Sequence, residues 1–336
     1  MTPRGRPSRQ SVLEDLDRAR AGLAEVGGLP KPEEARAIWD GIWHEETHHS
    51  TALEGNTMVL NQVRILLEEG RAVGGKDLRE YLEIQAYAEA AQWVYAQAVG
   101  ADDWSAKDLI NLTELRHIHT LVVEPVWRHF PPPGSQPEEG PGSFRRHDVK
   151  PLASGYAPPS WPEVPALAAD WVEFAKVPPE GTHLMVHLAE AHARLERIHP
   201  FLDGNGRAGR LALNLMLVRS GYPPALIHKT DRMKYLKALR RADRDGNRGP
   251  LTELLARAVR HSIDRFGLPG LAGPHRMVPL TALADSAGLS LIALRRAAAR
   301  GRLEALRKSD QWYSTKQWIE AYKKSRKRGR RPAGEN

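Results

Sequence analysis

The sequence contains no cysteine. This excludes disulfides and thiolate-ligated metal sites and favours a reducing compartment. No run of apolar residues approaches the roughly 18 that a membrane-spanning helix needs. The first ten residues, MTPRGRPSRQ, are basic and polar and precede no apolar stretch, so no secretory signal is expected. Together these absences predict a cytoplasmic protein without membrane contact.

The composition that remains is that of an ordinary globular protein, with 41% hydrophobic and 27% charged residues. Its 336 residues are enough for two or three domains. The net charge of +8 is unevenly spread, because residues 323–331, KKSRKRGRR, are basic at seven of nine positions. We expect residues 326–336 to form a solvated, disordered tail, with nucleic-acid binding as the alternative.

Apolar residues recur three and four positions apart through most of the chain, which is the spacing of helices that bury one face. The fold is therefore predicted to be mainly α, with an N-terminal helical region over residues 1–100 and a core over residues 101–267. Gly70 is expected to end one of these helices, and Ser105 with Asp108 to cap the start of another.

Two loops rich in Pro and Gly interrupt the helical pattern. The first, FPPPGSQPEEGPGS, covers residues 130–143. The segment after it, FRRHDVKPLA at residues 144–153, is predicted to form a short β-hairpin. The second loop, LPGLAGPHRM at residues 268–277, separates off a small C-terminal module at residues 275–325.

The segment RIHPFLDGNGRAGRLALNLML has the features of a phosphate site. Gly204 and Gly206 let the backbone approach a ligand closely, and the N–H groups at the start of the following helix attract anions. Asn205 adds a neutral donor, and Arg207 and Arg210 lie three apart on one helix face.

Two further residues of this segment supply chemistry. The carboxylate of Asp203 is suited to hold Mg²⁺ on a phosphate. The imidazole of His199, whose ordinary pKa lies near neutrality, is suited to accept a proton. A Gly-rich turn between two core helices would need neither group, so the segment is predicted to be an active site.

These residues resemble the signature of the Fic family, H-P-F-x-D-G-N-G-R-x-x-R, at every fixed position. The resemblance implies a protein adenylyltransferase, which transfers AMP from ATP to a Ser, Thr or Tyr hydroxyl of a target protein. His199 would be the general base and Asp203 the Mg²⁺ ligand. The phosphates would be held by Gly204, Asn205, Gly206, Arg207 and, at the γ-phosphate, Arg210.

Two neighbouring segments extend the resemblance. PGSFRRHDVK, at residues 141–150, is similar to the family's flap, which holds the target segment by strand addition. Phe144, Arg145 and Val149 would then contact the target. MKYLKAL resembles the helix that closes the nucleotide pocket, with Tyr235 beside the adenine.

Residues 43–55, WHEETHHSTALEG, support two incompatible interpretations. Many Fic proteins carry an inhibitory helix with the pattern S/T-x-x-x-E-G/N upstream of the core, and Ser50 and Glu54 fit it, on a helix over about residues 43–57. Glu54 would then face Arg210 in place of the γ-phosphate.

The alternative interpretation is a zinc protease. His44, Glu45 and His48 spell H-E-x-x-H, in which two imidazoles one helical turn apart bind zinc and the Glu activates water. A third zinc ligand would come from Glu54, Glu68 or Glu69. The Fic interpretation is favoured because it accounts for residues 50–55 and 199–210 together, and the His residues are then expected on a polar helix face.

Residues 278–322 resemble a winged helix-turn-helix of the excisionase and MerR type. LADSAGLS would be the helix-turn unit, LIALRRAAARG the recognition helix and LEALRKSDQWYST a two-stranded wing. Four arginines would contact DNA phosphates or base edges: Arg295, Arg296, Arg300 and Arg302. The alternative is a module that recruits a protein target. DNA and a homodimer both remain open as partners.

Two other functions remain open for the core. The same site could remove AMP from a target, with Glu54 orienting the attacking water. Alternatively, the protein could be a transcription regulator whose Fic domain only senses ATP. An intact His199 argues against a sensor, which needs no base.

Overall fold

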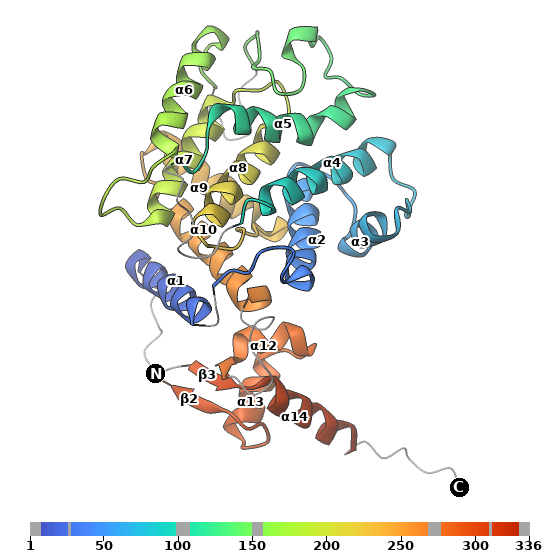
Figure 1. The fold of residues 1–336 in the computed structure, drawn as a ribbon, viewed down its shortest axis with the longest axis vertical. Coiled ribbons are helices and arrows are strands. Elements are labelled where there is room, and N and C mark those ends of the chain that lie inside the picture. Colours follow the sequence, from blue (N-terminus) through green and yellow to red (C-terminus); the bar gives the residue numbers. More distant parts are fainter. Residues whose placement is uncertain are drawn as a thin grey trace.

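Helices make up most of the structure, a computed structural model that describes residues 8–25, 28–98, 108–149, 157–267, 277–308 and 311–328 (Figure 1). The mainly α fold is confirmed. The larger, helical part contains α1 (Arg9–Ala24), α2 (Arg36–Leu53), α3 (Leu60–Glu69), α4 (Leu78–Tyr95), α5 (Leu112–Trp127), α6 (Val164–Ala175), α7 (Leu184–Ile198), α8 (Asn205–Arg219), α9 (Arg232–Arg244) and α10 (Gly249–Ser262). Its short turns are η1 (Pro137–Glu139), η2 (Trp161–Glu163), η3 (Lys229–Asp231) and the π-helical η4 (Ile263–Gly267).

Helix α8 lies at the centre of this part, in contact with α2, α4, α5 and α7 (Figure 1). After its first turn the sequence RLALNLMLV is apolar nearly all round, and helices of this kind are buried. Every residue of α8 except Gly206 is buried. Arg207 and Arg210, near its N-terminus, are therefore held by the core rather than by a surface loop.

The N-terminal helices share this core. Helix α1 packs on α10, where Nη1 of Arg260 lies 2.6 Å from Oδ2 of Asp15. Helix α2 lies along α4, and α4 in turn contacts both α5 and α8. The helices on either side of residue 100 thus contribute to one hydrophobic cluster. The division predicted at that residue remains a prediction.

One predicted helix end is confirmed: Gly70 ends α3 in the left-handed conformation, with φ 66°. The cap predicted for Ser105 with Asp108 involves residue 105, which lies outside the described residues. Helix α5 begins at Leu112, because Oδ1 of Asn111 accepts the N–H of Glu114 while the Glu114 carboxylate accepts the N–H of Asn111.

The hairpin predicted over residues 144–153 is absent from its described part, residues 144–149, where turns and extended backbone occur but no strand. Residues 150–156 lie outside the described part of the chain. The physical reason is at Arg145, whose N–H donates to the carbonyl of Pro200 at 3.0 Å. The segment is therefore bonded to the loop after α7 rather than to a second strand.

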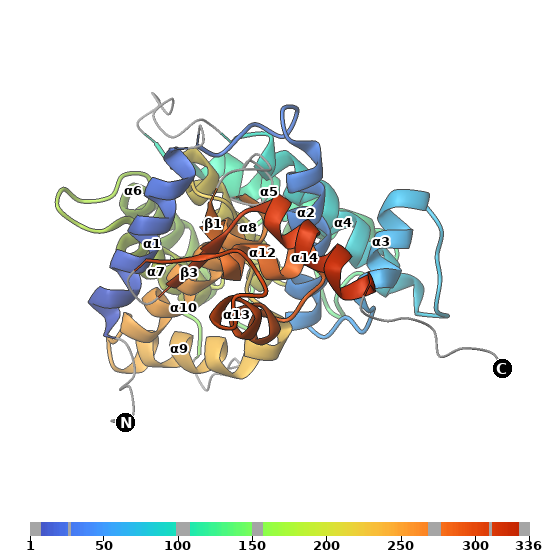
Figure 2. The same ribbon diagram turned by 90° about the horizontal axis from the view of Figure 1, so that it is seen from below.

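In the described residues of the C-terminal module, three strands form a sheet in the order β1-β3-β2. Figure 2 shows β1 and β3 together with the helices α12, α13 and α14. The two-stranded wing is confirmed, since β2 and β3 pair antiparallel with Leu306 opposite Tyr313. The strand β1, paired to β3, was not predicted. In chain order the elements are β1 (Val278–Pro279), α12 (Leu280–Ala287), α13 (Leu291–Ala299), β2 (Leu306–Lys308), β3 (Gln311–Ser314) and α14 (Lys316–Arg328).

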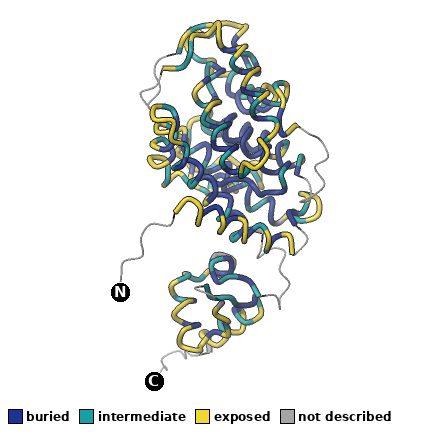
Figure 3. Tube along the Cα trace, turned by 90° about the vertical axis from the view of Figure 1, so that its left-hand side faces the viewer, coloured by how far each residue is buried: buried dark blue, intermediate teal, exposed yellow. Residues whose placement is uncertain are grey.

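Residues 326–328, predicted to belong to a disordered tail, are instead the last residues of α14. Residues 329–336 lie outside the described part of the chain. Figure 3 shows buried residues concentrated inside the helical part, with a smaller buried set in the C-terminal module. Within the described residues, no helix combines the length and the apolar character needed to cross a membrane.

Candidate active site

His199 ends α7 and begins the loop that leads into α8. Its backbone is left-handed, with φ 49°, and it is the one residue other than glycine with a positive φ in the described part of the chain. The following Pro200 disfavours a further helical residue at this position. A non-glycine residue held in this region stores strain, and such strain gathers at functional sites.

Side-chain contacts fix the conformation of this loop, some from Asn205 at the start of α8 and one from α5. The side-chain amide of Asn205 accepts from the N–H of Phe201 at 2.9 Å and donates to its carbonyl at 2.7 Å. The ring of Phe201 stacks on His119 of α5, with centroids 3.7 Å apart. Asn205 therefore closes the turn with its side chain, using one of its two side-chain N–H donors. The phosphate contact expected of Asn205 remains a prediction.

His119 also joins the loop to the flap segment, residues 141–149. Its Nδ1 accepts the N–H of Gly142, so its Nε2 carries the proton and donates to the carbonyl of Asp203 at 2.9 Å. Burial lowers the pKa of His119 to about 4, which keeps the ring neutral. The sequence analysis did not single out His119, because nothing in its local pattern indicates a partner 84 residues away.

Arg145 was predicted to contact the target, but its side chain is fully buried. The guanidinium donates to the carbonyls of His199 at 2.9 Å, His147 at 3.1 Å and Pro159 at 2.6 Å. Arg145 therefore shapes the loop instead of meeting a target. Phe144 and Val149 are half-buried, and Phe144 packs 5.7 Å from the ring of Phe201.

The N-terminus of α8 has the features of an anion site. Gly204 is left-handed, with φ 78°, and a Cβ there would lie 2.5 Å from a methyl group of Val123. Beyond it, the first N–H groups of the helix have no partner within the helix. The Arg207 side chain is 5% exposed, and its Nε and Nη1 are buried without a hydrogen-bond partner. Since buried donors normally have partners, this guanidinium has the chemistry to bind a phosphate.

Asp203, the predicted Mg²⁺ ligand, lies at the edge of this anion site with 39% of its side chain exposed. Oδ1 accepts the N–H of Gly204 at 2.6 Å and lies 3.5 Å from Nη2 of Arg207. Its other oxygen, Oδ2, is 3.6 Å from Arg79 of α4, a neighbour that the sequence analysis missed. No cluster of three ligating side chains occurs in the described residues. A single carboxylate still fits Mg²⁺, which is commonly held by one carboxylate and the substrate phosphates.

Glu54, Ser50 and Arg210 are brought together as the sequence predicted. Nη1 of Arg210 lies 2.9 Å from Oε1 of Glu54, Nε donates to Oγ of Ser50 at 2.7 Å, and Nη2 donates to its carbonyl at 2.9 Å. Burial opposes the charge on Glu54, but Arg210 outweighs it and lowers the pKa of the carboxyl. All three guanidinium nitrogens are thus bound by the last turn of α2.

This last turn is itself anchored by residues outside the predicted set. Arg232, at the start of α9, donates through Nε to the carbonyl of Leu53 at 2.8 Å. One turn earlier, the buried carboxylate of Glu46 accepts from the hydroxyl of Tyr87 at 2.7 Å and from Nδ2 of Asn214 at 2.6 Å. Burial raises the pKa of Glu46 to about 7. These contacts join α2 to α4, α8 and α9.

The imidazole of His199 is half-buried in the same region. Burial lowers its pKa to about 4, so the ring is neutral near pH 7 and has a nitrogen able to accept a proton. Its Nδ1 is 3.4 Å from the carbonyl of Glu196. A neutral imidazole beside an anion site is the arrangement that general-base catalysis requires.

A cavity of about 200 Å³ opens beside His199, Glu54 and Arg210. Its apolar wall is formed by Leu53, Ala193, Leu236 and Leu239. Tyr235 also lines the cavity but is buried, and its hydroxyl shares a 2.7 Å hydrogen bond with Nε2 of His192. The place predicted for Tyr235, beside an adenine, remains a prediction.

The residues of the zinc interpretation have other partners. Nε2 of His44 lies 3.4 Å from Oε1 of Glu68, while Glu45 pairs with Arg265. His48 is buried and its ring lies beside His49. Because no group of three metal-ligating side chains occurs in the described residues, the H-E-x-x-H spacing here reflects helix packing.

Comparison with known proteins gives a consistent result. Residues 109–217 match the family described as Fic/DOC. The chain is similar to the protein adenylyltransferase Fic of Culex quinquefasciatus, at 33% identity over 262 residues that make up 76% of this chain and 48% of that protein. The protein of the same name from Drosophila melanogaster is 33% identical over 258 residues. The chain spans about half the length of the curated relatives it matches.

Solved structures agree in fold. Fic-1 from C. elegans superposes with a TM-score of 0.60 at 26% identity, covering 76% of this chain and 71% of that one. A Fic domain containing signaling protein from Bacteroides thetaiotaomicron gives a TM-score of 0.63 at 22% identity, covering 82% of this chain and 98% of that one. The second likeness concerns the fold alone.

Proposed function

The chain carries a Fic/DOC family domain at residues 109–217, and from that premise we propose that it is a protein adenylyltransferase. It would transfer AMP from ATP to a Ser, Thr or Tyr hydroxyl of another protein and release pyrophosphate. The similarity to proteins named protein adenylyltransferase Fic supports this activity. The observation that carries the proposal is the neutral imidazole of His199 beside an anion site where two buried nitrogens of Arg207 have no hydrogen-bond partner.

In this mechanism the target hydroxyl oxygen attacks the α-phosphorus of ATP, and the bond to the pyrophosphate oxygen breaks. His199 accepts the hydroxyl proton on its free ring nitrogen. Arg207 and the N–H groups at the start of α8 bind the phosphates and stabilise the charge that develops on them. Bound at Asp203, Mg²⁺ would neutralise part of the phosphate charge. ATP and Mg²⁺ are therefore part of the proposal.

The same proposal includes autoinhibition by Glu54. A guanidinium binds either a carboxylate or a phosphate through its planar fork. Because Arg210 is engaged by Glu54 and Ser50, its fork is not available to the γ-phosphate. ATP would then bind weakly, or with its α-phosphate out of line for attack.

The decisive test uses the full chain with Glu54→Gly, incubated with lysate and ATP labelled at the α-phosphate, followed by mass spectrometry. We expect AMP on hydroxyl side chains, either of lysate proteins or of the chain itself. ATP labelled at the γ-phosphate is the matched control and should leave no label on protein. Transfer of the γ-label, or no transfer from either substrate, would refute the adenylyltransferase proposal.

Removal of AMP is the second candidate for the same site. The Glu54 side chain is 43% exposed, and a Cβ added at Gly206 would lie 2.3 Å from its Oε1. A carboxylate so close to the phosphate loop is placed to orient a water molecule. Release of AMP from an adenylylated target by the parent chain, and not by Glu54→Gly, would favour this activity.

For the C-terminal module we propose DNA as the partner. Three exposed arginines lie on or directly after α13: Arg295, Arg296 and Arg300. Helix α13 is the helix expected to enter the major groove of DNA. Binding should weaken with salt by about −0.9 in the log–log slope for each phosphate contacted. Replacing the three arginines by Ala should remove DNA retention in a mobility-shift assay. Retention unchanged by these substitutions would favour the protein-recruitment alternative.

Two further parts of the proposal concern the state of the protein in the cell. A cytoplasmic location is supported by the absence of cysteine. A second copy of the chain is the remaining candidate partner. Light scattering of the full chain measures directly whether a homodimer forms.

A further inference from the structure

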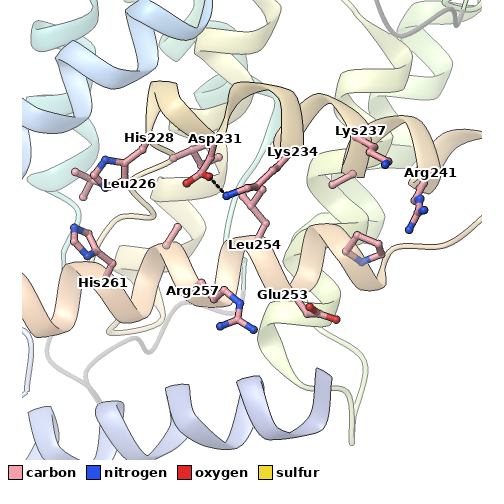
Figure 4. A pocket seen from close by; sticks show the side chains of 14 residues that line it. Leu226, His228, Asp231, Lys234, Lys237, Arg241, Glu253, Leu254, Arg257 and His261 are labelled. Carbon is pink, nitrogen blue, oxygen red and sulfur yellow. Dashed lines mark hydrogen bonds and ion pairs between the residues drawn. The ribbon is translucent and has the colours of Figure 1, made fainter. Parts of the chain in front are cut away.

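A groove of about 710 Å³ runs between α9 and α10 and is separate from the cavity beside His199 (Figure 4). Helix α9 is a wall of both spaces: Tyr235 and Leu239 line the cavity, while Lys237 and Arg241 line the groove. The volume of the groove lies within the range of about 300–1,000 Å³ of small-molecule sites.

Basic side chains dominate the walls of the groove. Lys234, Lys237 and Arg241 are three and four positions apart, so they lie along one face of α9. Arg257 adds a cation from α10. Nζ of Lys234 is neutralised by Asp231 at 2.6 Å. The side chains of Lys237, Arg241 and Arg257 have no ion pair or hydrogen bond within the described residues. With Asp231 and Glu253 as the carboxylates of the lining against four Lys and Arg side chains, the groove keeps an excess of positive charge, which attracts an anion.

The groove floor is apolar and includes Leu226, Ile227, Ala238, Leu254 and Ala258. Contact between this apolar floor and a ring or another apolar group would stabilise a bound ligand. The cationic walls suit a ligand that carries several negative charges. We infer that the groove binds a phosphorylated small molecule with a planar or apolar body, of the nucleotide class. An isolated phosphate ion would leave the floor uncovered.

One end of the groove reaches the inhibitory helix α2. His228 and His261 lie together at this end, opposite Arg241, with ring centroids 5.0 Å apart (Figure 4). The other face of His228 meets His49 of α2, at 4.4 Å between centroids. His49 directly precedes Ser50, the residue that binds Arg210. A ligand that contacts His228 is therefore separated from His49 of α2 only by the His228 side chain.

A second contact connects the groove to α2. Arg232, three residues before Tyr235 on α9, holds the carbonyl of Leu53. A ligand that neutralises the cations on α9 and α10 draws the two walls together and makes α9 more rigid. The last turn of α2 is then held more firmly on Arg210. This coupling, unlike the binding site itself, rests on the proposed inhibition by Glu54.

Inorganic tripolyphosphate is the probe for the binding site, and isothermal titration calorimetry of the full chain is the measurement. All chains carry Arg207→Ala, which removes the arginine expected to bind phosphate in the active site. Adding Lys237→Gln, Arg241→Gln and Arg257→Gln should weaken binding at least tenfold. The matched control removes three cations elsewhere, with Arg64→Gln, Arg128→Gln and Lys176→Gln, and should change affinity less than twofold.

The substituted groove residues are exposed, so the fold should be kept, and thermal melting verifies this. Equal affinities in the groove and control variants would overturn the site. Because this assay needs no catalysis, its failure would leave the adenylyltransferase proposal standing.

Hydrogen exchange measures the coupling. Tripolyphosphate should slow amide exchange in residues 47–54 of a chain with an intact groove and have no effect in the groove variant. Unchanged exchange in both chains would overturn the coupling to α2.

Discussion

Two arginine–carboxylate pairs join the N-terminal helices to the phosphate loop, and they differ in burial. In the first, Glu54 of α2 meets Arg210, whose side chain is 5% exposed, at 2.9 Å. In the second, Arg79 of α4 meets Asp203 at 3.6 Å, with side chains 49% and 39% exposed. One pair therefore occupies the predicted γ-phosphate site and the other the predicted metal site.

Because Arg210 is buried and Arg79 is exposed, the two pairs are expected to contribute different amounts of free energy. An exposed pair contributes about 0–1 kcal/mol, because water and salt screen it and both side chains lose freedom. Arg210 is buried, keeps its charge and is bonded by Ser50 as well as Glu54. The contact at Glu54 is thus expected to control activity, whereas the contact at Arg79 is expected only to adjust it.

Both pairs can influence AMP transfer only if His199 accepts the proton of the target hydroxyl. The largest expected effect on the transfer rate therefore comes from substituting His199. His199→Asn should lower transfer by about 10²–10⁴ in rate, because general-base catalysis contributes that much. Asparagine tolerates the left-handed backbone of this position, which separates loss of the base from loss of the fold. ATP affinity, measured by calorimetry, should remain near the parent value. Parent-like modification by His199→Asn would remove His199 as the base.

The second effect tests the pair between Glu54 and the buried Arg210. Glu54→Gly should raise auto- or target modification at least tenfold, equivalent to about 1.4 kcal/mol, because Arg210 becomes free for the γ-phosphate. Glu54→Gln is the matched control: it keeps the side-chain size but loses the charge, and it should lie between the parent and Glu54→Gly. Rates are measured over a range of ATP concentrations.

A double variant sharpens this result. Adding Arg210→Ala to Glu54→Gly should remove most of the gain, since the residue released by Glu54→Gly is then missing. If Glu54→Gly is no more active than the parent at any ATP concentration, the autoinhibition hypothesis is wrong even where the transfer activity is present.

A smaller effect is expected from the exposed pair. Arg79→Ala should lower the Mn²⁺ concentration needed for half-saturation in the presence of ATP by up to about fivefold, the equivalent of about 1 kcal/mol. Electron paramagnetic resonance of Mn²⁺ measures this without catalysis. Arg64→Ala is the control, because Arg64 pairs with Glu68 at the same 3.6 Å and is similarly exposed. A shift of equal size in both variants would contradict a role for Arg79 at Asp203.

The smallest effect should come from two buried histidines of α2, His44 and His48. His44→Ala and His48→Ala are expected to leave Mg²⁺-dependent transfer within about twofold and to lower the free energy of unfolding by about 1 kcal/mol, as substitutions of packed residues commonly do. Phenanthroline should have no effect. Loss of activity in either variant or with the chelator would revive a role for zinc.

Sequence alone identified the parts of the site that are close together in the chain. Residues 199–210 lie within twelve positions, and the residue types needed for a base, a metal ligand and an anion site are all present there. The wing of the C-terminal module was also predictable, since hairpin pairing is local. Ser50 and Glu54 were linked to Arg210 only through the resemblance, because 160 residues separate Ser50 from Arg210.

Tertiary structure decided which side chains surround those residues. Arg79, His119 and Arg232 reach the site from three different helices, and no periodicity in the sequence indicates such contacts. Arg145 illustrates the reverse case: its place in the flap predicted an exposed target contact, yet the packing of the loop supplied three carbonyls that bury its charge. Local pattern determines which elements form and which face is apolar, whereas the partners of a polar group depend on how those elements pack against one another.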